Sequence, residues 1–207
     1  MLPFCSAVFK MPRLCRVPTW LTLCIGVLLL SGCASSVTPP DRYLLPVNQD
    51  GQVTTTAQHR LLLRQPRLAN YLEVDGIIMQ LDDITLNEAR EHLWAEGLGR
   101  QLEQRMRTSL GRLLPETQVL RDTASSDGLR LQLEVDTFQG RYDGYAVVAG
   151  QWQLLDAEGR TQNLESFHVE TVLEEDGYPA LVRALGRSWE QVASELALAI
   201  CRLQTAP

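Results

Sequence analysis

LRLQLEVD, residues 129–136, alternates leucine or valine with charged or amide side chains. This period of two is typical of a β-strand that has one face on the core and the other in water. Arg141-Tyr142-Asp143-Gly144 follows and contains Asp-Gly, a strong signal for a hairpin turn. Two further apolar segments, residues 145–154 and 167–173, lie on either side of a second turn at 156–159. The stretch therefore predicts three antiparallel strands in sequence, a meander.

Two amphipathic helices are predicted, one before the meander and one after it. Apolar residues recur every three or four positions in each. Pro115 ends the first helix, and Pro179 suits the first turn of the second. We interpret the second stripe as contact with the sheet, with Trp189 in the core; a coiled-coil seam is the alternative. The apolar positions are Trp94, Leu98, Leu102, Met106, Leu110, Leu113 and Leu114, then Leu181, Val182, Leu185, Trp189, Val192, Leu196, Ile200 and Leu203.

Shorter extended segments surround the first helix. Pro46 marks the first of them as a sheet edge or as the end of a strand, and Asp82-Asp83 is expected to form a tight hairpin turn. A strand after the first helix would complete a β-α-β crossover and make the sheet partly parallel. The fold class is therefore α/β, a mixed β-sheet with an antiparallel meander and two main helices packed on it. The predicted strands are 42–47, 60–64, 76–81, 84–87 and 117–120, with an irregular segment or single turn at 66–72.

The N-terminus is predicted to be a secretory leader. Three basic residues between positions 10 and 16 precede an apolar run, 20–29, that is too short to span a bilayer. The run ends in Leu30-Ser31-Gly32-Cys33, which resembles the lipobox of bacterial lipoproteins. The resemblance implies cleavage after Gly32 and attachment of fatty acyl chains, palmitate among them, to Cys33. A plain signal peptide that contains Cys is the alternative, and Met11 is an alternative start.

The expected domain organisation follows from this leader. Residues 1–32 are the lipoprotein signal peptide, 33–41 are the lipidated Cys33 and its tether, and 42–207 are one globular domain of sufficient length for a full core. In the sorting rule of the lipoproteins that the leader resembles, Asp after the Cys retains the protein at the inner membrane. Ala34 instead implies the periplasmic face of the outer membrane.

The mature chain is acidic and poor in cysteine. Loss of the leader leaves sixteen basic residues, all of them Arg, against 25 acids, a formal charge of −9. This balance argues against a nucleic-acid surface and against electrostatic binding to anionic lipid. Cys201 alone remains besides Cys33, and we interpret it as a small buried hydrophobe, with an intermolecular disulfide as the alternative. One Cys and three scattered His residues predict no metal site and no cofactor.

A hydrolase would need a nucleophile beside a base. Gly186-Arg187-Ser188 is the nearest Gly-x-Ser, but it lies within the predicted last helix and lacks the second Gly of a nucleophile elbow. His92 and His168 lie in polar surroundings on different predicted elements. No catalytic residue is therefore expected.

Four segments occur in an order that resembles the auxiliary lipoproteins of ABC-type transport systems, and among them the paraquat-inducible branch. The segments are RYLLP at 42–46, WAEGL at 94–98, FQGRYDG at 138–144 and DGY at 176–178, followed by the Trp-containing helix. The resemblance covers about residues 42–203. Arg42 and Gly97 depart from the family pattern, which has an aromatic residue and often a proline at these positions.

The resemblance implies a function. It implies a mixed-sheet domain similar to the amino-terminal domain of TolB. It also implies that this chain is an accessory subunit of a route for lipid between two membranes, with an MCE-domain tunnel protein of the PqiB type and a polytopic membrane protein of the PqiA type as partners. Such tunnels resemble symmetric rings, so several copies are expected to assemble around the tunnel mouth. The alternatives are an envelope-binding lipoprotein and a periplasmic hydrolase.

Arg141, Tyr142 and Asp143 are the candidate partner-binding residues. In the first interpretation, Arg141 pairs with Asp143 and Tyr142 covers the sheet edge. In the second, the turn contacts a partner, because Tyr and Arg are favoured anchors at protein interfaces.

Overall fold

The computed structural model describes residues 39–46, 57–122 and 127–205, all within one compact unit that spans 39–207. The leader, Cys33 and most of the tether lie outside the described residues. The elements are β1 Asp41–Tyr43, β2 His59–Leu63, β3 Arg67–Leu68, a 3₁₀ turn η1 at Asn70–Leu72, β4 Gly76–Gln80, β5 Leu86–Trp94, α2 Leu98–Leu113, β6 Thr117–Arg121, β7 Leu129–Arg141, β8 Tyr145–Leu155, β9 Thr161–Val172 and α3 Tyr178–Thr205.

The sheet is organised around β7. On one side β7 pairs antiparallel with β8, and β8 pairs antiparallel with β9, so the predicted meander is confirmed. On the other side β7 pairs in parallel with three short strands in turn: β2 near its start, β3 at its middle and β4 at its end. The sheet continues from β2 to β6 and from β4 through β5 to β1. It is therefore mixed, as predicted.

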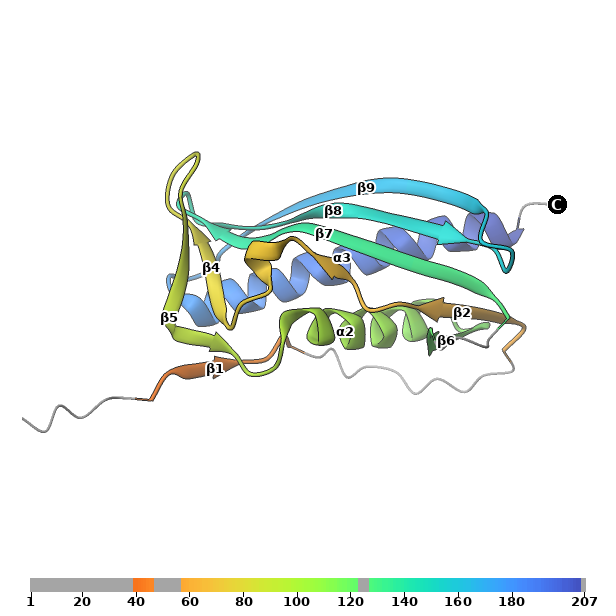
Figure 1. Cartoon of the computed structure of the whole chain (residues 1–207), viewed down its shortest axis with the longest axis horizontal. Coiled ribbons are helices and arrows are strands. Elements are labelled where there is room, and N and C mark those ends of the chain that lie inside the picture. Colours follow the sequence, from red (N-terminus) through yellow and green to blue (C-terminus); the bar gives the residue numbers. More distant parts are fainter. Residues whose placement is uncertain (1–38, 47–56, 123–126, 206–207) are drawn as a thin grey trace, which may run out of the picture. The chain divides into compact units, whose positions relative to one another are not determined.

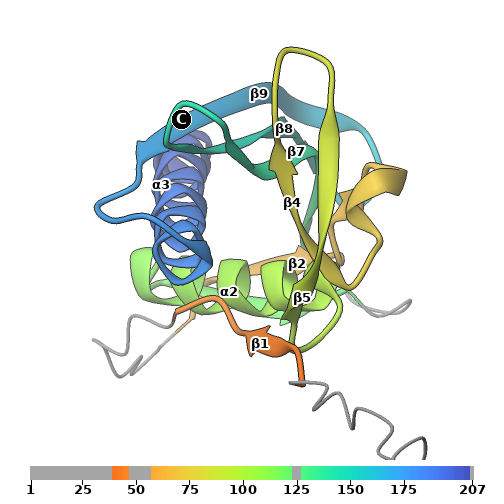
Figure 2. The ribbon, with the colours of Figure 1, turned by 90° about the vertical axis from the view of Figure 1, so that its left-hand side faces the viewer.

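Both helices lie inside the curve of the sheet (Figures 1 and 2). α3 packs against β7, β8 and β9, and α2 packs against α3 and β6. Each helix turns its apolar stripe inward, which is the arrangement that the period of three to four residues predicts. The predicted fold class is confirmed: a mixed sheet, a meander and two main helices.

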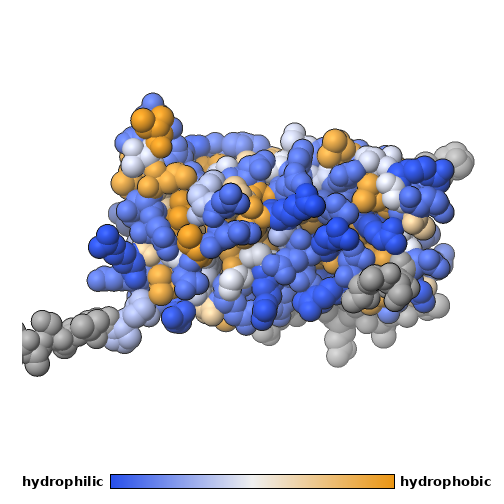
Figure 3. Space-filling view, viewed as in Figure 1, coloured by the Kyte–Doolittle hydropathy of each residue, from blue (hydrophilic) through white to orange (hydrophobic). Residues whose placement is uncertain are grey.

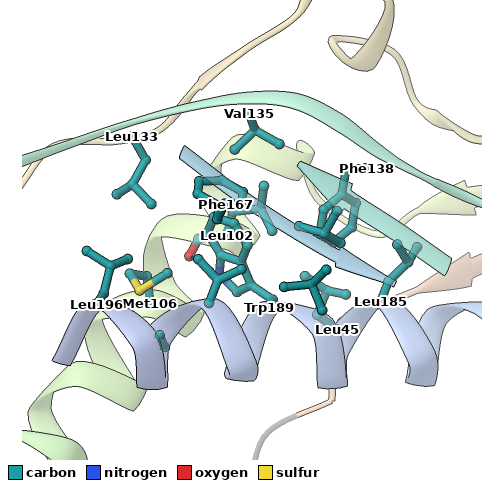
Figure 4. Close-up of a cluster of buried hydrophobic side chains, with 14 of the residues drawn as sticks. Leu45, Leu102, Met106, Leu133, Val135, Phe138, Phe167, Leu185, Trp189 and Leu196 are labelled. Carbon is teal, nitrogen blue, oxygen red and sulfur yellow. Dashed lines mark hydrogen bonds between the residues drawn. The ribbon is translucent and has the colours of Figure 1, made fainter. Parts of the chain in front are cut away.

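Trp189 lies at the centre of the core (Figure 4). Its ring meets Phe138 and Phe167 edge-on, with 6.2 Å between ring centroids in both pairs. Its indole N–H donates to the backbone carbonyl of Leu102 at 3.1 Å, so α3 is also joined to α2 through a buried polar contact. The core position predicted for Trp189 is confirmed.

Trp94 belongs to β5 and not to the first helix, which corrects the sequence interpretation. It pairs in register with Tyr43 of β1, and its N–H donates to the Asp75 carbonyl at 2.7 Å. α2 begins four residues later, after Gly97. Trp94 and Leu98 both point into the same core. A buried residue at the end of a strand and another at the start of the next helix therefore show the same four-residue spacing as two buried residues of one helix.

Four further expectations need correction. The crossover through α2 joins β6 in parallel to β2 and not to β5, the strand directly before the helix. The β4–β5 connection is a loop of five residues, 81–85, and not a two-residue turn.

Cys201 is exposed, because it lies three residues after the exposed Leu198 on the solvent face of α3. Leu203 is exposed too, and the buried stripe ends at Ile200.

The segment that follows the tether is attached firmly to the domain. β1 pairs with the end of β5, as the predicted edge strand. Leu45 is buried and its N–H donates to the Gln101 side chain of α2 at 2.9 Å. Pro46 lies so close to Gly186 of α3 that a Cβ at Gly186 would approach the proline ring to 2.7 Å. The segment therefore contacts both helices.

Candidate docking surface

The turn between β7 and β8 contains all three candidate partner-binding residues. Residues 142–144 form the loop, Gly144 has a φ of +87°, and its N–H donates to the Arg141 carbonyl at 3.0 Å. This conformation is open to glycine at little cost, which explains why Asp-Gly is the signal for such turns.

Arg141 is held by contacts within the chain. Its Nε donates to Asp143 at 2.8 Å, and its two terminal nitrogens donate to the Glu170 carboxylate of β9 at 2.6 and 3.1 Å. The guanidinium also lies 5.1 Å from the Tyr145 ring centroid. The predicted pairing of Arg141 with Asp143 is thus present.

The hydrogen bonds of Arg141 lower the pKa of both carboxylates. Hydrogen bonds from Arg141 and then from His168 lower the pKa of Glu170 to about 2. A hydrogen bond from Arg141 likewise lowers the pKa of Asp143. Both acids therefore stay ionised at neutral pH, and two carboxylates face one guanidinium at this turn.

Tyr142 is largely exposed. Its side chain is 62% exposed, while Arg141 and Asp143 are engaged with each other. Of the three candidate residues, Tyr142 is therefore the one that offers a large exposed side chain to a partner.

The β4–β5 hairpin lies beside this turn. Gln80, the last residue of β4, pairs with Arg141, the last residue of β7, and the two strands are parallel. Their following loops consequently leave the sheet at the same end. Gln139 reinforces the junction, since its side-chain amide donates to the Gln80 side chain at 3.1 Å.

The candidate nucleophile and bases occupy separate places. Ser188 is fully buried in α3, where its hydroxyl is hydrogen bonded to the Ala184 carbonyl and to Thr171. His92 stacks on Tyr178 at 4.0 Å and lies 3.0 Å from the Tyr43 hydroxyl. His168 contacts Glu170 on the outer surface. The structure does not bring either histidine to Ser188 by any of these contacts.

The described residues lack two features that would suggest other functions. Neither described helix has an apolar stretch long enough to cross a membrane. No group of three or more His, Cys, Asp or Glu residues in this part of the chain could hold a metal ion.

Comparison with known proteins identifies the family. Residues 43–197 match the family described as the ABC-type transport auxiliary lipoprotein component. The chain belongs to this family.

Relatives of this auxiliary lipoprotein support the assignment. This chain is 35% identical over 186 residues to the intermembrane transport lipoprotein PqiC of Escherichia coli and to that of Shigella flexneri. Each match covers 89% of this chain and 98% of the relative. A crystal structure of an uncharacterized protein is 29% identical, with a TM-score of 0.70, and the match covers 79% of this chain and 99% of that one. A Xanthomonas campestris protein, 20% identical with a TM-score of 0.61 over 77% and 90% of the two chains, shares the fold.

Two exposed hydrophobic residues of this auxiliary lipoprotein, at the same end of the sheet, were not predicted from the sequence. Leu81 and Ile84 were assigned to strand ends, yet they lie in the β4–β5 loop with side chains 52% and 86% exposed. The available signal was the placement of Asp82-Asp83 between them, because a turn exposes the apolar residues beside it. Alternation alone could not separate a strand end from a loop.

Proposed function

We propose that this protein is a lipid-anchored, non-catalytic accessory subunit of an intermembrane lipid transport system and docks its periplasmic tunnel protein. The observation that carries the proposal is the 35% identity to intermembrane transport lipoproteins over 98% of their length. The match covers 89% of this chain, and the family model alone covers residues 43–197, most of the globular domain.

The anchor is Cys33, and Ala34 directs it to the outer membrane. Seven residues, 34–40, separate Cys33 from β1. At about 3.1–3.5 Å per residue they span at most about 22–25 Å, which limits the distance between the domain and the lipid. Acyl chains bound at about 0.8 kcal/mol per buried CH₂ make the attachment stable when two or more are present. The protein thereby faces the periplasm.

The partners are an MCE-domain tunnel protein of the PqiB type and, through it, a polytopic membrane protein of the PqiA type. The contact uses the β7–β8 turn. Tyr142 contacts the partner, and the pairing of Arg141 with Asp143 holds the turn in position. Several copies form a ring at the tunnel mouth, so that modest contacts add through multivalency. No cofactor, metal or nucleic acid takes part.

Binding to the immobilised tunnel protein tests this proposal. The lipid-free mature chain, residues 34–207, is passed over the partner alone and after tethering to a lipid surface. We expect specific binding that Tyr142→Ala weakens, because a large exposed aromatic ring is lost. Leu198→Ala, which removes a 60% exposed side chain from α3, is the matched control and should bind like the parent. Absence of parent binding in both formats would contradict the docking role.

A further inference from the structure

Exposed hydrophobic side chains gather at one end of the sheet. Nine large hydrophobic side chains are exposed in the described part of the chain, and five of them lie at the end where β4, β7 and β9 finish. Figure 3 shows hydrophobic residues on the projecting tip at the upper left. We call this group the tip surface; it consists of Leu81, Ile84, Leu86, Tyr142 and Val172.

Strand register explains why these side chains belong together. Gln80, Arg141, Tyr145 and Val172 are paired across four neighbouring strands, so they form a row at this end. Leu81 and Tyr142 each follow a member of that row directly. The β4–β5 hairpin, which contains Leu81, Ile84 and Leu86, projects beyond the body of the sheet, as both views of the ribbon show (Figures 1 and 2).

Clusters of exposed hydrophobic side chains often mark interaction sites. We propose that the tip surface inserts into an apolar socket with a basic rim on the protein partner, with the β4–β5 hairpin as the main contact. The inference rests on the proposed function and deepens it, because it names the docking element and the chemistry of the surface that receives it.

The charge around the tip surface selects that chemistry. Asp82 and Asp83 lie in the β4–β5 loop, Asp143 follows Tyr142 in the β7–β8 turn, and Glu170 is hydrogen bonded to Arg141. At this turn Asp143 and Glu170 both form ion pairs with the guanidinium of Arg141. The surface therefore presents hydrophobic side chains within a net negative field, which complementary Lys or Arg residues on a partner would match.

A bilayer is a poor occupant of this surface. The N–H groups of Ile84 and Thr85 donate to the Asp82 carboxylate at 2.9 and 2.7 Å, and these bonds lower the pKa of Asp82. An ionised carboxylate at the tip would have to leave water for hydrocarbon before Ile84 could insert, which is strongly unfavourable. Headgroups of anionic lipids would also repel it.

A second copy bound through the same surface is a poor occupant as well. A two-fold interface would place the two hairpin tips, each with Asp82 and Asp83, against each other. Like charges at such a contact oppose association. A partner with the opposite charge remains the occupant that the surface fits.

Surface variants test the inference in the binding assay. Leu81→Ser/Ile84→Ser should raise the dissociation constant at least about tenfold, through faster dissociation. Asp83→Lys should slow association, and this effect should shrink between about 50 and 300 mM salt. Leu164→Ser, which changes a 56% exposed side chain at the other end of β9, is the control. All variants should keep the parent melting temperature, because they change exposed side chains.

The outcomes separate the inference from the proposed function. Parent binding that the hairpin variants leave unchanged would overturn the inference and leave the docking role intact. Absence of parent binding would overturn both. Hairpin-dependent flotation of the lipid-free chain with phosphatidylethanolamine–phosphatidylglycerol vesicles would assign the tip surface to a membrane and overturn the inference. Hairpin-dependent self-association in sedimentation would assign it to a second copy, with the same consequence.

Discussion

Replacing Trp189 by alanine is expected to destabilise the domain by about 3–5 kcal/mol, the usual range for truncating a buried tryptophan. The side chain is 2% exposed and packs edge-on against Phe138 and Phe167. Its loss would open a cavity between α3 and the sheet and leave the Leu102 carbonyl without its indole donor. For a domain of this size the melting temperature should fall by about 6–20 °C.

Thermal unfolding with two companion variants checks this prediction. Trp189→Phe keeps a ring in the core but loses the N–H donor, so it should lose less stability than Trp189→Ala. Leu198→Ala removes an exposed side chain from the same helix and should change stability by less than about 0.5 kcal/mol. A Trp189→Ala protein that melts like the parent and fails only to bind its partner would place Trp189 at an interface and contradict the core assignment.

Replacing Cys33 by alanine is expected to abolish attachment to the outer membrane. The sulfur is the acylation site in the lipobox interpretation, and without acyl chains the chain has lost its anchor. We expect an unprocessed precursor without palmitate label. Labelling with a palmitate analogue, followed by separation of inner and outer membranes, measures both effects.

Cys201→Ala is the matched control for this experiment, because Cys201 is the other cysteine of the mature chain. This variant should be processed, labelled and localised like the parent. A Cys33→Ala protein that still sediments with outer-membrane vesicles would show that attachment does not depend on lipidation.

Local patterns in the sequence predicted the parts of the fold that strong periodicity controls. The alternation at 129–136 identified β7, the Asp-Gly pair placed its turn, and the long stripe around Trp189 identified α3 as a core helix. Each is fixed by neighbours in sequence or by one continuous buried face. They could be predicted because local and tertiary preferences agree.

Elements whose state depends on distant partners could not be predicted in the same way. Trp94 completes a helical stripe in sequence, yet pairing with Tyr43 and packing against Phe138 keep it in β5. The partner of β6 is β2, more than fifty residues earlier in the chain, which no local pattern encodes. Pairing across the sheet therefore determines the secondary structure and the strand neighbours that local periodicity does not specify.

The candidate site shows the same division. The pairing of Arg141 with Asp143 could be predicted because the residues are two apart, whereas Glu170 comes from β9 and adds the second carboxylate. The proximity of Leu81 to Tyr142 depends on the parallel register of β4 with β7. The tip surface exists only after the sheet has formed.

Photocrosslinking in living cells tests the central claim, that this auxiliary lipoprotein docks the tunnel protein from its membrane anchor. The full chain, with its leader, carries p-benzoylphenylalanine in place of Tyr142 or, as the control, in place of the exposed Leu198. Irradiation should join position 142 to the MCE-domain protein, and position 198 should give little or none of that product. Crosslinks of position 142 to other envelope proteins, with none to the tunnel protein, would contradict the account.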